Sequence, residues 1–229
     1  GPDSATGVVA VTSGKGGVGK SSMTVNLAAA LVQKGLKVGI VDADIYGHSV
    51  PNLLGCTDGP TVLDDEMLLP PISHGIKHIS IGQFVEGNAP VVWRGPMLHR
   101  ALQQFLADVF WGDLDVLLLD LPPGTGDVAL SVAQLIPNAE LLIVTTPQAA
   151  AAEVAERAGS ISQQTRQRVA GVIENMGAMV MPDGSTMDVF GSGGGQIVAD
   201  RLGVILGHGV PLLASVPLDP PLRSGGDPG

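Results

Sequence analysis

The stretch Gly14-Lys15-Gly16-Gly17-Val18-Gly19-Lys20-Ser21 decides the fold of this chain. It matches the P-loop pattern G-x-x-x-x-G-K-[ST], in which backbone N–H groups turn inward around phosphates and glycines avoid side-chain clashes. A β-branched run at 8–12 precedes the loop, and apolar residues at helical spacing follow it from Met23 to Val32. The strand and helix that the motif requires are therefore present. A Rossmann dinucleotide loop is the weaker alternative, because the third glycine is missing at the required spacing.

The residues of this loop have separate expected roles. Lys20 supplies the charge for the β and γ phosphates, and the Ser21 hydroxyl coordinates magnesium. The helix that begins here directs its free N–H groups at the phosphates. Lys15 is a second lysine that an ordinary P-loop does not demand, and in a single chain it could be a solvated charge. We expect the ATP-binding residues here to be Gly14, Lys15, Gly16, Gly17, Val18, Gly19, Lys20, Ser21 and Ser22.

Strands and helices alternate along the rest of the chain. Continuous apolar runs predict parallel strands that are covered on both faces, and runs at helical spacing predict the helices between them. The fold class is therefore α/β, with a doubly wound, mostly parallel sheet, helices on both faces and ligands at the carboxyl ends of the strands. Residues 47–71 are expected to form surface loops with at most short helices. The expected strands are 8–12, 37–41, 76–81, 116–121, 141–146, 169–174 and 212–216, and the later helices are 96–110, 128–136, 148–164 and 196–202.

Carboxylates follow two of these strands. Asp42 and Asp44 end the second strand, and Asp120 ends a strand after Leu117-Leu118-Leu119, as a Walker B aspartate does. Hydrolysis of a magnesium triphosphate needs carboxylates at this edge, to hold the metal's ligands and to orient the attacking water. Gly124 could present its N–H to the γ-phosphate. The alternative role for Asp44 and for Asp127 is to cap a helix N-terminus.

Composition restricts the class of protein. The 229 residues fit one domain, and 45% apolar content supports a packed core. A net charge of -10 and only 3% aromatic residues argue against nucleic acid or membrane partners. The single cysteine, Cys56, excludes a disulfide scaffold and favours the cytoplasm. Gly1-Pro2 is typical of a cleaved tag, so residues 1–6 are expected to be a tag remnant or a linker.

The second lysine of the loop carries a resemblance to a known group. The pattern K-G-G-x-G-K-[ST] resembles that of the deviant Walker A ATPases of the MinD/ParA group. The resemblance implies a homodimer in which Lys15 reaches the phosphates of the other subunit and neutralises charge on the transferred group. It also implies that Asp42 belongs to the magnesium shell, with Ser21 and Asp120, and that Asp44 orients the nucleophilic water. The catalytic set would then be Lys15, Lys20 and Asp44.

Further motifs are similar to one subfamily, the Mrp/ApbC iron-sulfur cluster carrier ATPases. This resemblance implies a homodimeric, magnesium-dependent ATPase with slow turnover and an iron-sulfur assembly or client protein as partner. It also implies that Asn175 and Pro217 flank the adenine, and that residues 1–229 are one ATPase domain trimmed at its C-terminus. The motifs are 41–47 (V-D-A-D-I-Y-G), 92–97 (V-W-R-G-P-M), 119–127 (L-D-L-P-P-G-T-G-D), 173–176 (I-E-N-M), 190–195 (F-G-S-G-G-G) and 217–227.

One departure separates this chain from that subfamily. Its members usually carry Cys-x-x-Cys after E-N-M, and paired across the dimer these thiolates hold a [4Fe-4S] cluster. Here Met181 and Gly184 stand at those positions. Glycine has no ligand atom and a thioether is a poor iron ligand, so we expect no cluster held in the family's manner. Cys56 lies far away and is expected to be a small buried apolar residue.

Other features suggest ordinary structural roles. His74 and His78 share one side of a strand, and we expect a solvated face there rather than a metal site. The methionine-rich stretch 176–187 is expected to be a loose core hairpin, with a partner surface as the alternative. The segment 203–209 is longer than the usual link between the last helix and strand of the subfamily.

Two other functions remain open from the sequence. The first is a MinD/ParA-like positioning or partition ATPase that binds membrane or DNA, which the negative charge opposes. The second is a scaffold that binds ATP and barely hydrolyses it, because turnover depends on the fine placement of Asp44, Lys15 and the attacking water.

Overall fold

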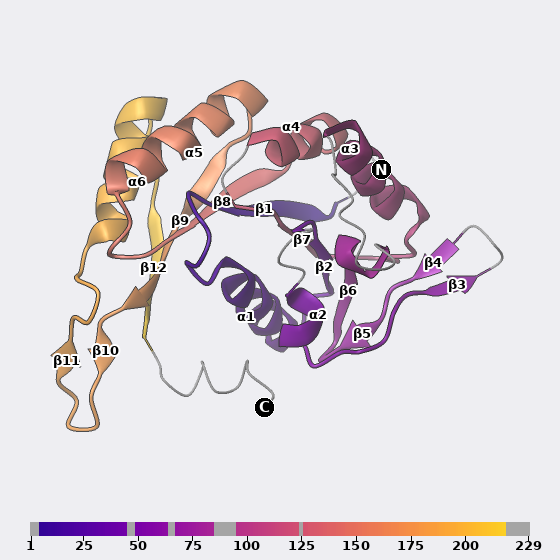
Figure 1. The fold of residues 1–229 in the computed structure, drawn as a ribbon, viewed down its shortest axis with the longest axis horizontal. Helices are drawn as coiled ribbons and strands as arrows, with labels where there is room; N and C mark the ends of the chain where they lie inside the picture. The colour runs from indigo at the N-terminus through magenta and orange to yellow at the C-terminus, as the bar shows by residue number, and fades with distance from the viewer. Residues whose placement is uncertain (1–4, 45–48, 64–66, 85–94, 124–125, 219–229) are drawn as a thin grey trace.

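A central, mostly parallel sheet organises the molecule (Figure 1). The computed structural model describes residues 5–44, 49–63, 67–84, 95–123 and 126–218. Within them, eight strands follow the order β12-β9-β8-β1-β7-β2-β6-β5, and all neighbours are parallel except β5 and β6. The strands are β1 Gly7–Ser13, β2 Val38–Asp42, β5 Ile72–Ser73, β6 Ile76–Ser80, β7 Val116–Asp120, β8 Glu140–Thr145, β9 Val169–Gly177 and β12 Leu212–Pro217.

Helices cover both faces of this sheet, which confirms the expected fold class. Helices α1 (Lys20–Gln33) and α2 (Val50–Leu53) lie on one face. On the other face lie α3 Gly95–Asp108, α4 Gly126–Leu135, α5 Ala151–Thr165 and α6 Gly194–Leu206. A short 3-10 helix, η1 Ile81–Phe84, follows β6. None of the helices in the described part of the chain is long and apolar enough to span a membrane.

The central strands β2, β7 and β8 are largely apolar because both of their faces are buried. Leu117 and Leu119 of β7 point into the large core beneath α3 to α6, whereas Leu118 between them points into the smaller core beneath α1 and α2. All three side chains are at most 5% exposed. This two-sided burial fixes the positions at which the strands end, and the candidate site lies at those ends.

Several element boundaries differ from the sequence expectations. The stretch 47–71 is not made of loops and short helices alone, because β3 (Thr61–Leu63) and β4 (Met67–Leu69) form an antiparallel hairpin. Strands of three residues are too short for an alternating pattern to be detected. The link before β12 is shorter than expected, because α6 continues through Gly203 to Leu206 and is capped by Gly207, where φ is +75°. Helix α5 begins at Ala151 rather than near residue 148.

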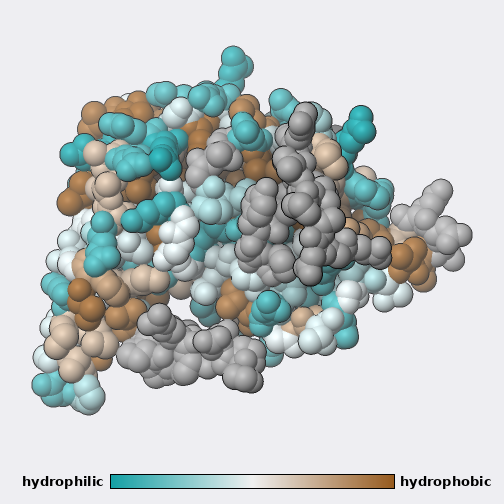
Figure 2. Space-filling model, in the orientation of Figure 1, coloured by the Kyte–Doolittle hydropathy of each residue, from teal (hydrophilic) through white to brown (hydrophobic). Residues whose placement is uncertain are grey.

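The methionine-rich stretch is an exposed hairpin, so the expectation of a core hairpin was wrong. Strands β10 (Met179–Val180) and β11 (Thr186–Met187) pair with each other in a sheet of their own. This hairpin projects from the body beyond the end of β9 (Figure 1). Val180 is 60% exposed and Met187 is 49% exposed. Figure 2 shows apolar surface on this projection, at the lower left of the molecule.

The expected solvated face at the two histidines was wrong for His78. This residue is fully buried on β6, whereas His74 is exposed in the turn before it. The His78 Nε2 atom lies 3.1 Å from Ser73 Oγ, and its Nδ1 atom has no hydrogen-bond partner. Burial lowers the pKa of the imidazole, so the neutral form is favoured.

Candidate nucleotide-binding site

The P-loop joins β1 to α1 in the conformation that its glycines permit. Gly17 and Gly19 have φ values of +79° and +75°, in the left-handed region. A Cβ atom added at Gly19 would lie 2.4 Å from Asn175 Nδ2, so a side chain is excluded there by contact as well. Helix α1 begins at Lys20, and its first N–H groups face the loop. The result is a backbone cradle at the carboxyl end of β1.

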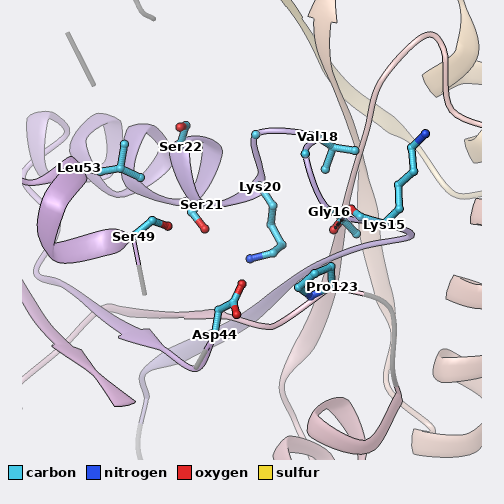
Figure 3. A pocket seen from close by; sticks show the side chains of 13 residues that line it. Lys15, Gly16, Val18, Lys20, Ser21, Ser22, Asp44, Ser49, Leu53 and Pro123 are labelled. Carbon is cyan, nitrogen blue, oxygen red and sulfur yellow. Dashed lines mark hydrogen bonds between the residues drawn. The ribbon is translucent and has the colours of Figure 1, made fainter. Parts of the chain in front are cut away.

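A cavity of about 310 Å³ opens in front of this loop (Figure 3). Of the predicted ATP-binding residues, Gly14 is not part of the lining and packs against Val154 of α5 instead. Asn175 and Pro217 do not line the cavity either, and Gly124 lies outside the described residues. The cavity lining consists of Ser13, Lys15, Gly16, Gly17, Val18, Gly19, Lys20, Ser21, Ser22, Asp44, Ser49, Leu53 and Pro123.

The carboxylate of Asp120 gathers three donors at the floor of the site. Lys20 Nζ lies 2.6 Å from Asp120 Oδ1, and Ser21 Oγ donates to Oδ2 at 2.6 Å. Thr24 Oγ1 donates to Oδ1 at 3.1 Å. Asp120 is fully buried, so these three donors replace the water that would otherwise solvate its carboxylate. Thr24 was not predicted from the sequence, although it lies four residues after Lys20 on α1 and therefore shares the helix face that meets Asp120.

Asp42 lies beside Asp120, as expected from the two strand ends. The two residues are register partners of β2 and β7, and both are fully buried. Asp42 Oδ1 accepts the N–H of Asp44, and Oδ2 accepts the Val50 N–H and the Ser80 hydroxyl. Burial, and then the charge of Asp120, raise the pKa of Asp42 to about 6. This pair of carboxylates therefore favours a nearby cation.

The donor set at this edge fits magnesium. A hydroxyl and two carboxylates are hard oxygen ligands, which Mg²⁺ prefers. In the described part of the chain no group of three or more His, Cys, Asp and Glu residues could hold a metal alone. A magnesium ion that keeps several waters and shares phosphate oxygens needs no such group. Ser21, Asp42 and Asp120 are therefore suitable partners for a metal that arrives with a nucleotide.

Asp44 and Lys15 differ in burial and in the direction of their side chains. Asp44 is 9% exposed and its carboxylate points across the cavity toward Lys20 (Figure 3). Ser49, not Asp44, stands at the N-cap position of α2, so Asp44 does not cap that helix. Lys15 is exposed, and its side chain points away from Lys20 and Asp44 (Figure 3). Within one chain the amine of Lys15 therefore does not take part in the Asp120 network.

Helix α5 supports the start of the loop. Arg157 donates from Nη1 to the Gly14 carbonyl oxygen at 2.7 Å, and its Nη2 lies 2.7 Å from Glu153. Ser13 Oγ also donates to the Lys15 carbonyl oxygen. No local sequence signal indicated Arg157, because α5 is separated from the loop by more than a hundred residues. The contact is visible only in the folded chain.

The residues 174–176 connect the loop to the projecting hairpin. Glu174 is buried and accepts the Gly195 N–H of α6 at 2.6 Å and the Ser215 hydroxyl of β12 at 2.8 Å. Asn175 Nδ2 donates to the Val18 carbonyl oxygen at 3.0 Å. Met176 follows with a φ of +56°, which is uncommon for a residue other than glycine. The P-loop and the hairpin are thus held by neighbouring residues of β9.

The fold and this site define a class of protein. A doubly wound parallel sheet, a glycine-rich loop that leads into α1, and buried aspartates at neighbouring strand ends are the features of a P-loop NTPase. A family model described as "ParA: NUBPL iron-transfer P-loop NTPase" matches residues 4–229. The chain belongs to this family of iron-transfer P-loop NTPases, as the sequence motifs indicated.

Several known proteins are similar to this chain in sequence or in structure. An iron-sulfur cluster carrier protein of Mycobacterium bovis is 70% identical over 228 residues, which are 100% of this chain and 60% of the relative. The chain thus spans about 60% of the length of that relative. A nucleotide-binding protein of Archaeoglobus fulgidus, solved with ADP, is 38% identical with a TM-score of 0.81, over 96% of this chain and 85% of the other. The MinD protein of Pyrococcus horikoshii, solved with Mg-ADP, shares the fold at 23% identity and a TM-score of 0.61, over 96% of this chain and 85% of the other.

Proposed function

We propose that residues 1–229 form one ATPase domain that binds ATP with magnesium and hydrolyses it slowly as a homodimer. The observation that carries this proposal is the buried network in which Lys20, Ser21 and Thr24 all donate to Asp120. Lys20 and Ser21 also line the P-loop cavity, so each of these two can exchange the carboxylate for a phosphate or metal-bound oxygen.

Nucleotide binding would rearrange this network. Lys20 would leave Asp120 and donate to the β and γ phosphates, while Ser21, Asp42 and Asp120 would hold the magnesium, the carboxylates through water. The metal supplies charge neutralisation for the phosphates. The pKa of Asp42, which its burial raises to about 6, would fall beside a cation, so this carboxylate would be ionised in the bound state.

Hydrolysis would need a second copy of the chain. Asp44, buried and directed at the cavity, would orient the attacking water. Lys15, exposed at the rim, would neutralise the transferred phosphoryl group in the site of the partner subunit. An amine that points out of its own site supports a role across a dimer interface.

The iron-sulfur cluster is the cargo named for the relatives, and we propose that this chain serves such a pathway without holding the cluster on its hairpin. Met181 and Gly184 offer no thiolate, and Cys56 is half-buried after α2, with its thiol donating weakly to the Asp58 carbonyl. The ATP cycle would instead act on an assembly or client protein in the cytoplasm. The contact of Asn175 with the P-loop gives the nucleotide a route to the hairpin.

Calorimetry of ATP binding in magnesium buffer tests the nucleotide site directly. Lys20→Ala should remove most of the affinity, because it deletes a charge-assisted phosphate contact at the floor of the cavity. Lys34→Ala, at the exposed end of α1, is the matched control and should bind ATP as the wild type does. Equal affinity in Lys20→Ala and Lys34→Ala would exclude the P-loop as the ATP site.

A further inference from the structure

A second polar cavity lies on the helical face away from the P-loop cavity. It has a volume of about 420 Å³ and lies between α3 and α4. Its α3 residues are spaced at i, i+3, i+4 and i+7, so they form a single stripe along that helix. The lining consists of Pro96, His99, Arg100 and Gln103 from α3, and Ser131 and Gln134 from α4.

The polar side chains of this groove have no partner among the residues that the structure describes. In the described part of the chain, no hydrogen bond or ion pair involves the side chains of His99, Arg100, Gln103, Ser131 or Gln134. Ser131 is only 8% exposed, and its hydroxyl reaches the surface at the groove without a partner in the described part of the chain. These donors and acceptors are therefore open to a ligand.

The charge of the groove selects its ligand. None of its described lining residues is an aspartate or a glutamate, although the chain carries a net charge of -10. Two other arginines, Arg157 and Arg168, are each paired with a glutamate at 2.7 Å, whereas Arg100 has no carboxylate partner among the described residues. An unpaired guanidinium beside a histidine favours a carboxylate, to which arginine binds in a bidentate manner.

The remaining side chains favour a peptide over a free anion. Gln103 and Gln134 each present an amide donor and an amide acceptor, which complement the C=O and N–H of a peptide bond. A simple anion offers acceptors only, and it would leave both amide oxygens unsatisfied. Among the described residues that line the groove there is no aromatic or long aliphatic side chain, so these residues offer no surface for a base or an acyl chain.

We propose that the groove between α3 and α4 docks an acidic segment of a partner protein, with a glutamate or aspartate side chain on Arg100 and the peptide backbone on Gln103 and Gln134. This proposal is independent of ATP hydrolysis. Helix α4 follows β7 and Asp120 in the chain, so a segment bound here lies on the element that leaves the nucleotide site.

The test uses nuclear magnetic resonance of the ¹⁵N-labelled chain and a triglutamate peptide with both ends blocked. Saturable shifts are expected for the side-chain amides of Gln103 and Gln134 and for the Arg100 Nε–H. Arg100→Gln should weaken binding about tenfold or more, as loss of a charged hydrogen bond does. Gln134→Ala should weaken it about threefold. Arg201→Gln, an exposed arginine on α6, is the matched control and should leave binding unchanged.

Four outcomes would overturn the proposal. Blocked triglutamine could produce the same shifts, which would remove the role of charge. Arg201→Gln could weaken binding as much as Arg100→Gln, which would indicate general electrostatic attraction. The groove could show no saturable shifts with triglutamate. Acetate or inorganic phosphate could bind as tightly as the peptide and displace it, which would make the groove a site for a free anion.

Discussion

The edge of the sheet that carries the P-loop and the hairpin β10–β11 differ in almost every physical respect. At the edge, Asp42 and Asp120 are fully buried, and each carboxylate accepts three hydrogen bonds. On the hairpin, Val180 and Met187 are largely exposed, and the strands pair only with each other. The first region is organised for chemistry in advance of its ligand. The second offers exposed surface and no thiolate for an iron-sulfur cluster.

The two regions are nevertheless joined by consecutive residues. Asn175 bonds to the P-loop, and Met176 turns the chain toward the hairpin in a left-handed conformation. A change at the loop can therefore reach the hairpin without a long pathway. The difference teaches that the P-loop cavity and the exposed hairpin are separate regions of this chain, and that residues 174–176 connect them.

The largest expected effect concerns hydrolysis at the P-loop site, which we expect to need a second subunit. Lys15→Ala and Asp44→Ala should each lower hydrolysis by about a hundredfold or more, as loss of a transition-state contact does. A 1:1 mixture of the two variants should recover about a quarter of the wild-type rate. Half of its dimers contain one subunit of each variant, and each such dimer has one of its two sites complete, with Asp44 from one subunit and Lys15 from the other. Steady-state phosphate release measures both effects. Proven subunit exchange without recovery would restrict Lys15 to its own chain.

The connection between the regions is tested at Asn175. Asn175→Ala deletes the hydrogen bond to the Val18 carbonyl, and ATP affinity should fall by about fivefold, the effect of one buried hydrogen bond. In the wild type, ATP with magnesium should change the hydrogen exchange of amides 177–189, and in Asn175→Ala this change should be lost. Gln163→Ala, which removes a long hydrogen bond at the surface of α5, is the control. An unchanged hairpin response in Asn175→Ala would contradict the connection.

The smallest expected effect concerns the buried imidazole of His78 on β6 and the pH dependence of stability. Burial lowers the pKa of His78 below its ordinary value of 6.5, so the unfolded chain binds this proton more readily than the folded chain. Stability should therefore be lost as the pH falls below about 6.5, by at most about 1.4 kcal/mol at pH 5.5. Urea unfolding at pH 7.5 and 5.5 should show a smaller loss in His78→Gln. The exposed control His208→Gln should behave as the wild type, and an identical loss in all three proteins would remove His78 as the cause.

The sequence predicted those parts of the molecule that depend on contiguous residues. The P-loop is a single motif, and the strands that carry Asp42 and Asp120 are continuous apolar runs whose ends must meet at one edge of a parallel sheet. The parts that depend on distant packing were missed. Arg157 reaches Gly14 from α5, and Ser80 reaches Asp42 from β6.

His78 and the hairpin were misjudged for a related reason. A period of two shows that His78 shares a face with Ile76, but not that α2 covers this face. Methionine and valine in the stretch 176–189 indicate apolar surface, but not whether a core lies beneath it. Both outcomes follow from where other elements pack, and no local pattern contains that information.

The central claim is that this chain holds the nucleotide and not the cluster. The most direct measurement is anaerobic reconstitution with iron and sulfide, followed by desalting under nitrogen and determination of bound ATP, iron and acid-labile sulfide on the same sample, for wild type and Cys56→Ser. The account predicts that both proteins bind one ATP per chain and that neither keeps stoichiometric iron, because the chain offers one thiol and the cluster ordinarily needs four. Near-stoichiometric iron and sulfide that survive in Cys56→Ser would contradict it, since cluster ligands other than cysteine would then exist in the chain.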